Sequence, residues 1–361
     1  MSALDSAKEV RKGEELDTAQ LEALFRSKLP ELSGPISVQQ FPRGHSNLTY
    51  LLKVGDREVV LRRPPRGAKA IKTGHDMHRE FTVLSKLRSA YPLVPKALLY
   101  VDEAESPLGA SFYVMERVPG VILRNKPPAD YELTPELMRR LSEKFVDSLA
   151  ELHAIDLSKV GLSDFGKPDG YVQRQVDGWI DRYNKSKTDE IAEMETLGGW
   201  LEANVPPSHA GTLIHNEFKN DNLVLDPGDL TKIRAVLDWE MATVGDPLAD
   251  LGTSLAYWFE PSEADAVGPG VIGLTILPGN LTREQVVERY GQKTGRDVSR
   301  MLFYYILGLY KVAVIAQQIY ARFKKGLTTD ERFGALIFAV NLLSQAGVTA
   351  MEKKRLSGLL G

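Results

Sequence analysis

Residues 213–240, LIHNEFKNDNLVLDPGDLTKIRAVLDWE, decide the fold of this chain of 361 residues. Two short apolar runs, 223–225 and 233–237, are separated by a turn signal at Pro227-Gly228, which predicts strands joined by tight connections. Polar groups at the ends of buried strands indicate a binding or catalytic site rather than a solvated surface. The polar side chains concerned are His215, Glu217, Lys219, Asp221, Asn222 and Asp238.

These residue types suit magnesium-dependent phosphoryl transfer. Mg²⁺ is typically held by one or two carboxylate or amide oxygens together with nucleotide phosphates. Asn222 and Asp238 supply such a pair from two adjacent strand ends. Glu217 can orient and deprotonate an attacking hydroxyl, and Lys219 can neutralise charge on the transferring phosphoryl group. We therefore expect Mg²⁺ and a nucleotide, ATP in the leading hypothesis below, as cofactors, with Asn222 and Asp238 as the metal ligands.

The motifs in this stretch and after it resemble a known family. Residues 215–222, HNEFKNDN, fit the kinase catalytic loop H-R-D-L-x-x-x-N, and 237–240, LDWE, lie where protein kinases carry Asp-Phe-Gly. The continuation 245–251, GDPLADL, is not typical of protein kinases. It resembles the aminoglycoside phosphotransferase family, with its loop H-G-D-x-x-x-x-N and its tail D-W-E-x-x-x-x-G-D-P-x-x-D-L. Within that family the chain is most similar to the branch fused to, or encoded beside, acyl-CoA dehydrogenases.

The resemblance implies an α+β, two-lobed, protein-kinase-like fold. Residues 1–33 would form an N-terminal helical extension, 34–118 a β-rich N-lobe with one key helix, and 119–361 a mainly helical C-lobe with the catalytic loop and the acceptor site. The segment 111–120, SFYVMERVPG, corresponds to the family's hinge between the lobes. Backbone groups near Met115, Glu116 and Val118 are expected to meet the adenine there.

Two positions of the catalytic loop depart from the family pattern. Glu217 replaces the family's Asp, and Asn216 replaces its Gly. Glutamate keeps the carboxylate but moves it by roughly 1 Å, and a displacement of that size can cost on the order of 10²-fold in rate. Two interpretations therefore stay open, a working catalytic base and a catalytically impaired, nucleotide-binding pseudokinase.

Two features of the N-lobe are expected to contact the phosphates. In 41–50, FPRGHSNLTY, the backbone amides of Gly44, Ser46 and Asn47 could face phosphate oxygens, although an ordinary hairpin turn would look the same. The strand 59–62, VVLR, occupies the place of the kinase V-A-I-K strand, so that Arg62, or Arg63 beside it, replaces the lysine. Arg62 shares the inward face of the strand with Val60. We expect it to pair with Glu80, near the start of a helix over 75–90.

The C-lobe sequence predicts mostly helices. His153 is expected to be structural, and the family resemblance implies that Asp246 and Asp250 brace the catalytic loop. Residues 1–14 are charged and expected to fray. The predicted C-lobe elements are a helix from Thr134-Pro135 to His153, a charged helix over 176–204, a long loop over 260–280, a helix that starts at the capping box of Thr282 and Gln285, and helices near 299–325 and 330–353.

Composition narrows the possible partners. The formal net charge of −3 implies no nucleic-acid partner, and the absence of cysteine excludes disulfides and thiolate metal sites. The N-terminus lacks the apolar stretch of a secretory signal, so we expect a cytoplasmic protein. The apolar stretch 301–320 carries Lys311 at its centre, which favours a buried helix over a membrane span, and we expect no membrane partner.

The leading hypothesis is an ATP-dependent kinase that acts on a hydroxyl group of a small molecule. The acceptor should lie between the catalytic loop and residues 260–330. Similarity to the acyl-CoA-dehydrogenase-linked branch suggests a hydroxyacyl-CoA more than an aminoglycoside, and the basic cluster 322–325 would suit CoA phosphates. A protein kinase is disfavoured, because no Ala-Pro-Glu segment follows Asp238. The choice of ATP over GTP and the oligomeric state are not indicated.

Overall fold

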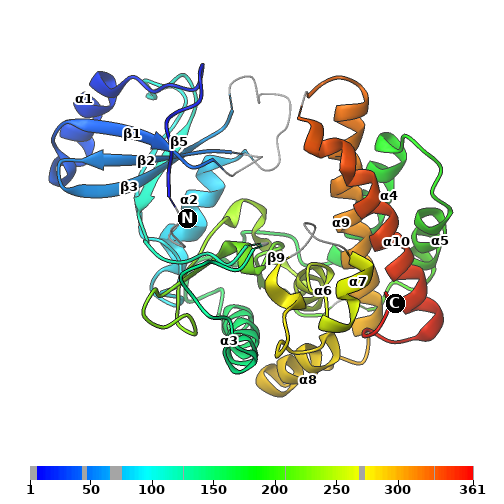
Figure 1. The fold of residues 1–361 in the computed structure, drawn as a ribbon. Coiled ribbons are helices and arrows are strands. Elements are labelled where there is room, and N and C mark those ends of the chain that lie inside the picture. Colours follow the sequence, from blue (N-terminus) through cyan, green and yellow to red (C-terminus); the bar gives the residue numbers. More distant parts are fainter. Residues whose placement is uncertain are drawn as a thin grey trace.

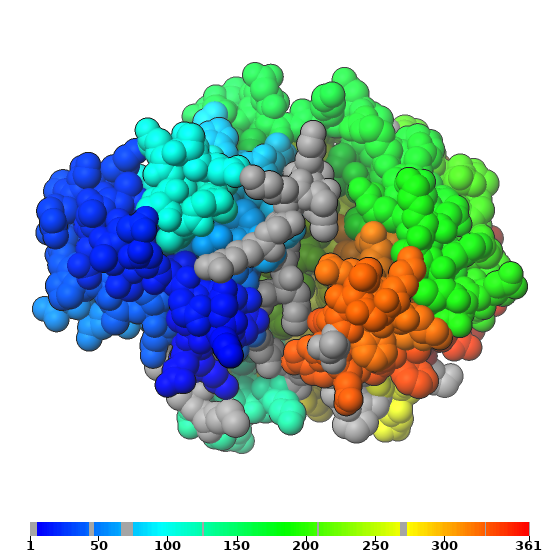
Figure 2. All heavy atoms as spheres, turned by 90° about the horizontal axis from the view of Figure 1, so that it is seen from above, coloured from blue at the N-terminus to red at the C-terminus, as the bar shows by residue number. Residues whose placement is uncertain are grey.

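The computed structural model describes residues 6–42, 47–65, 75–124, 126–207, 209–267, 273–328 and 330–360. Figure 1 shows two lobes, a β-rich N-lobe in blue and cyan and a larger, mainly helical C-lobe in green to red. Seen from above, the surface is hollowed between the N-lobe and the orange end of the α9–α10 hairpin (Figure 2). The α+β, two-lobed arrangement expected from the sequence is therefore present.

A five-stranded antiparallel sheet forms the N-lobe, in the order β1-β2-β3-β5-β4. Successive side chains of β3 point to opposite faces. Val59 and Leu61 pack with α1, whereas Val60 and Arg62 lie on the face covered by α2, so the inward direction predicted for Arg62 is confirmed. The elements are α1 (Thr18–Lys28), β1 (Ile36–Gln40), β2 (Leu48–Val54), β3 (Arg57–Arg63), α2 (Met77–Leu87), β4 (Ala97–Val101) and β5 (Phe112–Glu116).

The N-terminal segment is attached to this sheet, and the prediction of fraying is wrong for its described part. The backbone N–H of Lys8 donates to Gln40 O at 2.8 Å, and Gln40 N–H donates back to Lys8 O at 2.8 Å. The hydroxyl of Tyr50 donates to Glu14 O at 2.8 Å. Helix α1 then buries Leu21 and Phe25 against the sheet. Charged composition misled here because the pairing of Lys8 with Gln40 uses backbone groups, which every residue carries.

The central segment folds into short strands that place polar residues at their ends. Strands β7 (Leu223–Leu225) and β8 (Ile233–Val236) pair antiparallel, and β6 (Thr212–Ile214) pairs with β9 (Thr243–Gly245). Just beyond β8, the N–H of Leu237 donates to Asn222 O at 2.8 Å. The register therefore brings Asn222 beside the end of β8, one residue from Asp238.

Helix α9 is the central helix of the C-lobe, and α4, α5, α6 and α10 pack around it. Two glycines let α9 cross α6 closely. A Cβ on Gly252 of α6 would lie 2.1 Å from Tyr304 O, and a Cβ on Gly308 of α9 would lie 2.2 Å from Gly252 O. The C-lobe helices are α3 (Pro135–His153), α4 (Tyr171–Ser186), α5 (Ala192–Ala203), α6 (Pro247–Ala256), α8 (Arg283–Thr294), α9 (Met301–Lys324) and α10 (Leu336–Lys353).

The helix predicted over 176–204 is two helices, so that prediction is corrected. Helix α4 starts earlier, at Tyr171, and ends at Ser186, while α5 begins at Ala192. The buried Gln317 of α9 donates to the last carbonyl, Ser186 O, at 2.9 Å. The residues between the two helices include no proline or glycine, and the contact with Gln317 comes from a helix over 100 residues away in sequence. No local feature of the sequence therefore indicates the break.

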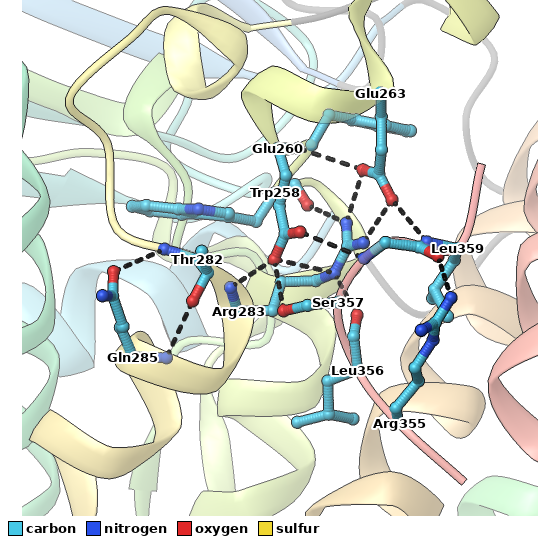
Figure 3. A network of polar contacts seen from close by, with 12 residues as sticks. Trp258, Glu260, Glu263, Thr282, Arg283, Gln285, Arg355, Leu356, Ser357 and Leu359 are labelled. Atoms are coloured by element: carbon cyan, nitrogen blue, oxygen red, sulfur yellow. Dashed lines mark hydrogen bonds and ion pairs between the residues drawn. The ribbon is translucent and has the colours of Figure 1, made fainter. Parts of the chain in front are cut away.

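The segment predicted as a loop over 260–280 contains short helical turns, η5 (Pro261–Glu263), α7 (Ala264–Val267) and η6 (Leu274–Ile276). Figure 3 shows why this region is ordered around Arg283, the first residue of α8. The buried guanidinium donates to Trp258 O at 2.7 Å, to Leu356 O at 2.6 Å and to the carboxylate of Glu263. The capping box predicted at Thr282 and Gln285 is confirmed beside it.

By length and composition alone, the segments Met301–Lys324 and Glu331–Lys353 are each apolar enough to cross a membrane. In the first, 72% of the most apolar window is buried inside the protein, against 33% in the second. The prediction of a buried C-lobe helix at 301–320 is therefore confirmed.

Candidate active site

The catalytic loop turns sharply at Asn216, whose φ of 68° lies in the left-handed region that non-glycine residues rarely adopt. Asparagine is one of the few residues that visit this region routinely. The carboxylate of Asp250 fixes the turn by accepting from the backbone N–H groups of His215 and Asn216, both at 2.7 Å. His153 Nε2 lies 3.1 Å from the same carboxylate. The bracing role expected of Asp250 and the structural role expected of His153 agree with these contacts.

Asp246 lies in a different place from Asp250, although the same bracing role was expected of both. It caps α6 by accepting from the N–H of Leu248 at 2.9 Å, and it accepts from the hydroxyl of Tyr304 at 2.9 Å. These contacts anchor the start of α6 to α9. Asp246 thus supports the helix that carries Asp250 rather than the loop itself.

His215 connects the loop to the strand end that carries Asp238. Its Nε2–H donates to Leu237 O at 2.9 Å, and its Nδ1 accepts from the N–H of Glu217 at 3.3 Å. Burial lowers the pKa of His215, so the ring is neutral at pH 7. A neutral ring with one donor and one acceptor matches this pair of contacts, and His215 therefore orients the loop rather than supplying a charge.

The side chains of Glu217 and Lys219 lie next to each other on the catalytic loop. Their side chains form an ion pair of 3.4 Å between Nζ and Oε2, and both stay partly open to solvent. The ammonium of Lys219 also lies 4.7 Å from the centre of the Tyr257 ring. Burial opposes its charge, but Tyr257 and Glu217 outweigh burial and raise the pKa of Lys219. The ammonium is therefore charged next to the candidate base.

Asn222 and Asp238 offer hard oxygen atoms at neighbouring strand ends. The amide of Asn222 donates through Nδ2 to Glu217 O at 2.9 Å, which leaves Oδ1 as its acceptor atom. Burial opposes ionisation of Asp238, but Arg62 and Lys219 hold the pKa of that carboxyl below its usual value. In the described chain, no group of three His, Asp or Glu side chains could hold a metal alone. The pair fits Mg²⁺, because phosphates and water complete the shell of this ion.

Arg62 is the centre of the charged cluster between the lobes. It is 7% exposed, and its guanidinium lies 2.6 Å from Glu80 Oε1, 3.0 Å from Asp238 Oδ1 and 3.1 Å from Glu240 Oε2. The predicted Arg62–Glu80 pair is confirmed. Arg63 instead donates to Pro64 O at 3.3 Å, which resolves the alternative in favour of Arg62 as the cation of this cluster.

Glu240 is a member of this cluster that the sequence reasoning missed. It accepts from Asn47 Nδ2 at 2.7 Å as well as from Arg62. Burial and the nearby charge of Asp238 raise its pKa. Asn47 therefore meets this carboxylate with its side chain, in addition to the backbone role predicted for it. The signal was present in the sequence, because Glu240 is the last residue of the LDWE motif.

The remaining nucleotide-site predictions concern the N-lobe loop and the hinge. Gly44 and Ser46 lie outside the described residues. Met115 is buried in β5 opposite Val60, and Val118 packs with the cluster of Val224 and Ala235. The side chain of Glu116 accepts from the N–H of Lys96 at 2.8 Å. The hinge side chains are thus used in packing, and a contact to adenine through the backbone stays a prediction.

Lys311 is the residue whose place was least expected. The sequence reasoning used it only as an argument against a membrane span. In the structure its ammonium donates to Asn216 O at 2.9 Å and to Asn216 Oδ1 at 3.2 Å, and Asn216 directly precedes Glu217. A lysine in the middle of an apolar helix was the available signal, because such a charge needs partners from elsewhere in the fold.

The sequence of this chain is similar to a family model and to several curated proteins. A sequence model described as the phosphotransferase enzyme family, APH, matches residues 37–291. The chain is 33% identical to acyl-CoA dehydrogenase family member 11 of Gallus gallus over 99% of its own length and 46% of that protein. It is 33% identical to acyl-CoA dehydrogenase family member 10 of Mus musculus over 80% of its length and 27% of that protein. The chain thus spans about half the length, or less, of these curated relatives.

Solved structures agree on the fold. A Ralstonia eutropha protein provisionally named an aminoglycoside phosphotransferase superposes with a TM-score of 0.79 at 29% identity, covering 94% of this chain and 99% of that one. An aminoglycoside phosphotransferase in complex with GDP and kanamycin superposes with a TM-score of 0.60 at 13% identity, covering 90% and 97%. The kinase-like fold expected from the sequence is therefore confirmed.

Proposed function

The chain belongs to the phosphotransferase enzyme family, and we propose that it transfers the γ-phosphate of ATP to a hydroxyl group of a small molecule. The observation that carries this proposal is the convergence of an anionic metal site, a charged lysine and a carboxylate on one loop and one strand end. A nucleotide partner is supported by relatives of the same fold that were solved with GDP or AMP-PNP.

Each residue of the site has a separate task in this proposal. Arg62, held by Glu80, contacts the phosphates from the N-lobe side. Lys219 neutralises charge on the transferring group, because its ammonium stays protonated. Glu217 accepts the proton of the acceptor hydroxyl while the acceptor oxygen bonds to the γ-phosphorus, and the bond to the bridging oxygen breaks to release ADP.

Asn222 and Asp238 would hold Mg²⁺ through Oδ1 of the amide and the ionised carboxylate. An ion held there would supply positive charge to offset the charge that develops on the phosphates. Arg62 binds Asp238 at 3.0 Å in this structure, so its guanidinium lies beside the proposed metal ligand.

The acceptor is proposed to be neutral or anionic rather than polycationic. The ammonium of Lys219 lies 3.4 Å from Glu217 and that of Lys311 contacts the preceding residue, so both would repel a polyamine. A hydroxyacyl-CoA suits this setting, and two of the relatives are acyl-CoA dehydrogenase family members. The exposed basic residues Arg322, Lys324 and Lys325 lie at the C-terminal end of α9 and could meet CoA phosphates.

The alternative is a nucleotide-binding pseudokinase, and the observation that favours it is Glu217 in the place of the family's Asp. Such a protein would keep the metal pair and the Arg62 cluster but transfer no phosphate.

Titration calorimetry with ATP, with and without Mg²⁺, tests the nucleotide site. We expect metal-dependent binding by the native protein and its loss in Asp238→Asn, because the amide removes the only full charge among the two metal ligands. ADP release with a panel of hydroxyacyl-CoA esters and aminoglycosides then tests the acceptor. Absence of ATP and GTP binding would overturn the proposal, whereas binding without turnover on any acceptor would favour the pseudokinase.

A further inference from the structure

Lys311 lies in the middle of α9 and is only 4% exposed. Its ammonium donates to Asn216 O at 2.9 Å, Asn216 Oδ1 at 3.2 Å and Thr253 Oγ1 at 3.4 Å. Among the described residues, no carboxylate lies within ion-pair distance of it. A lysine has three N–H donors, and here each of them has a neutral acceptor.

A buried charge of this kind is costly unless its interactions compensate for the lost water. Methionine would occupy much the same volume without that cost. The lysine therefore contributes through its donors and its charge rather than through packing, and two of its three contacts are with one residue of the catalytic loop.

That residue is Asn216, where the backbone is left-handed and the family pattern has glycine. Its side chain and backbone are held from several sides. Asp250 accepts from its N–H at 2.7 Å, its Nδ2 donates to Met241 O at 3.0 Å, and the hydroxyl of Tyr171 donates to its Oδ1 at 3.2 Å. Lys311 adds a hydrogen bond to its carbonyl, the only one that this oxygen accepts from the described residues.

The carbonyl of Asn216 belongs to the peptide that joins it to Glu217. Lys311 holds the oxygen of this peptide, and His215 Nδ1 accepts from its N–H on the other side. The orientation of a peptide plane sets the direction in which the next side chain leaves the backbone. The two contacts together therefore fix the peptide from which Glu217 extends.

We propose that Lys311 is a positioning residue of the phosphotransfer site, which holds the 216–217 peptide so that Glu217 meets the acceptor hydroxyl. The inference rests on the proposed function, because it assigns Glu217 the role of the base. The close crossing of α6 and α9 at Gly252 and Gly308 supports it, since Lys311 lies one turn beyond Gly308 on α9.

Several charged groups act on Lys311. Burial lowers its pKa to about 8, while Glu217 and Asp250 favour the ammonium and Lys219 and Arg182 oppose it. The ammonium is thus charged at pH 7 and loses a proton at mildly alkaline pH. The neutral amine keeps only two donors, so one of the three contacts is lost.

The test compares Lys311→Met with Lys185→Met, a matched control at an exposed lysine of α4. Native ATP binding and turnover are measured first, as ADP release with the best acceptor or with water. We expect Lys311→Met to bind ATP with unchanged affinity and to lose on the order of 10²-fold in kcat, the effect of a misplaced catalytic group. Lys185→Met should keep the native kcat.

Making Lys311→Met in the Asn216→Gly variant as well separates a role in positioning Glu217 from a general loss of structure. Glycine adopts the left-handed conformation without strain, so in Asn216→Gly the loop needs less support. Lys311→Met should therefore cost much less in Asn216→Gly than in the native chain. An equal loss in both backgrounds, or an unchanged kcat in Lys311→Met, would overturn the inference while leaving the kinase proposal intact.

A readout independent of turnover uses NMR. We expect the side-chain resonance of Lys311 to titrate at mildly alkaline pH and the amide resonance of Glu217 to follow it. A Glu217 amide that ignores this titration would contradict the inference. If the native protein binds no nucleotide or transfers no phosphate, the proposed function and this inference fail together.

Discussion

At position 217 the side chain carries one methylene more than the aspartate of the family pattern. In the structure, both the side chain of Glu217 and the peptide before it make contacts. Lys219 reaches its Oε2, and the peptide before it is held by Lys311 and His215. Asn216 beside it has the left-handed conformation that a glycine would adopt freely. To act as a base, the carboxylate of Glu217 must lie within hydrogen-bond distance of the acceptor hydroxyl.

Exchange of Glu217 for shorter and neutral side chains tests this at the residue scale. We expect Glu217→Asp to lower kcat on the order of 10²-fold, because it withdraws the carboxylate by roughly 1 Å. Glu217→Gln should cost roughly 10³-fold through loss of general base catalysis. Affinity for ATP should not change, because the side chain contacts no phosphate in the proposed mechanism. ADP release under saturating ATP gives these rates.

The control for that series is calorimetric binding of ATP by each variant, which shows that the nucleotide site is intact. A rise of kcat in Glu217→Asp would contradict the assignment of a working glutamate. It would instead support the pseudokinase, in which aspartate restores an activity that the native chain lacks.

At the scale of elements, the site depends on how closely α6 and α9 approach each other. Helix α6 carries Asp250 and Thr253, and α9 carries Lys311, so both helices reach the catalytic loop from behind. Glycine at 252 and 308 lets the two backbones come into contact. The sequence offers two scattered glycines and a lysine, and only the crossing of the helices gives them a common role.

We expect Gly252→Ala to destabilise the protein by roughly 3 kcal/mol, because a Cβ there would lie 2.1 Å from a backbone oxygen that cannot move without displacing α9. Urea unfolding followed by circular dichroism measures the change. Gly199→Ala is the matched control, because a Cβ on Gly199 of α5 would have no neighbouring atom within 4 Å. This control should gain about 0.5–1 kcal/mol from reduced backbone entropy. Equal effects of the two substitutions would contradict the close crossing.

At the scale of the whole molecule, the C-terminal tail is attached to the middle of the C-lobe. Glu260 accepts from the hydroxyl of Ser357 at 2.7 Å, and Glu263 accepts from the N–H of Leu359 at 3.2 Å (Figure 3). Arg283 neutralises both carboxylates from α8. Burial opposes the ionisation of Glu263, but Arg283 outweighs it and holds the pKa of that carboxyl below its usual value. One buried arginine therefore joins three separate segments of the chain.

We expect Arg283→Met to cost about 3–5 kcal/mol of unfolding free energy, because it leaves two carboxylates buried without their cation. Arg332→Met removes an exposed ion pair with Asp330 and should change stability by no more than about 0.5 kcal/mol. Urea unfolding of both variants measures the difference. A stability of Arg283→Met close to that of the control would mean that the network does not hold the tail.

The sequence by itself determined the fold class, the family and the catalytic motif. Apolar runs separated by turn residues place strands and their polar ends, and the spacing of His215, Asn222 and Asp238 is a local property of the chain. The Arg62–Glu80 pair could be predicted as well, because strand alternation turns Arg62 inward and the kinase pattern places a glutamate near the start of the next helix.

Only the tertiary structure decided which distant residues contact and support that motif. The break between α4 and α5, the attachment of residues 6–14, the place of Glu240 beside Arg62, and the contact of Lys311 with Asn216 all join residues distant in sequence. Burial and hydrogen bonding at such points depend on which backbones approach each other in space. The periodicity of the sequence does not predict which backbones will approach each other. The contact between Lys311 and the catalytic loop is therefore visible only once α9 is placed beside that loop.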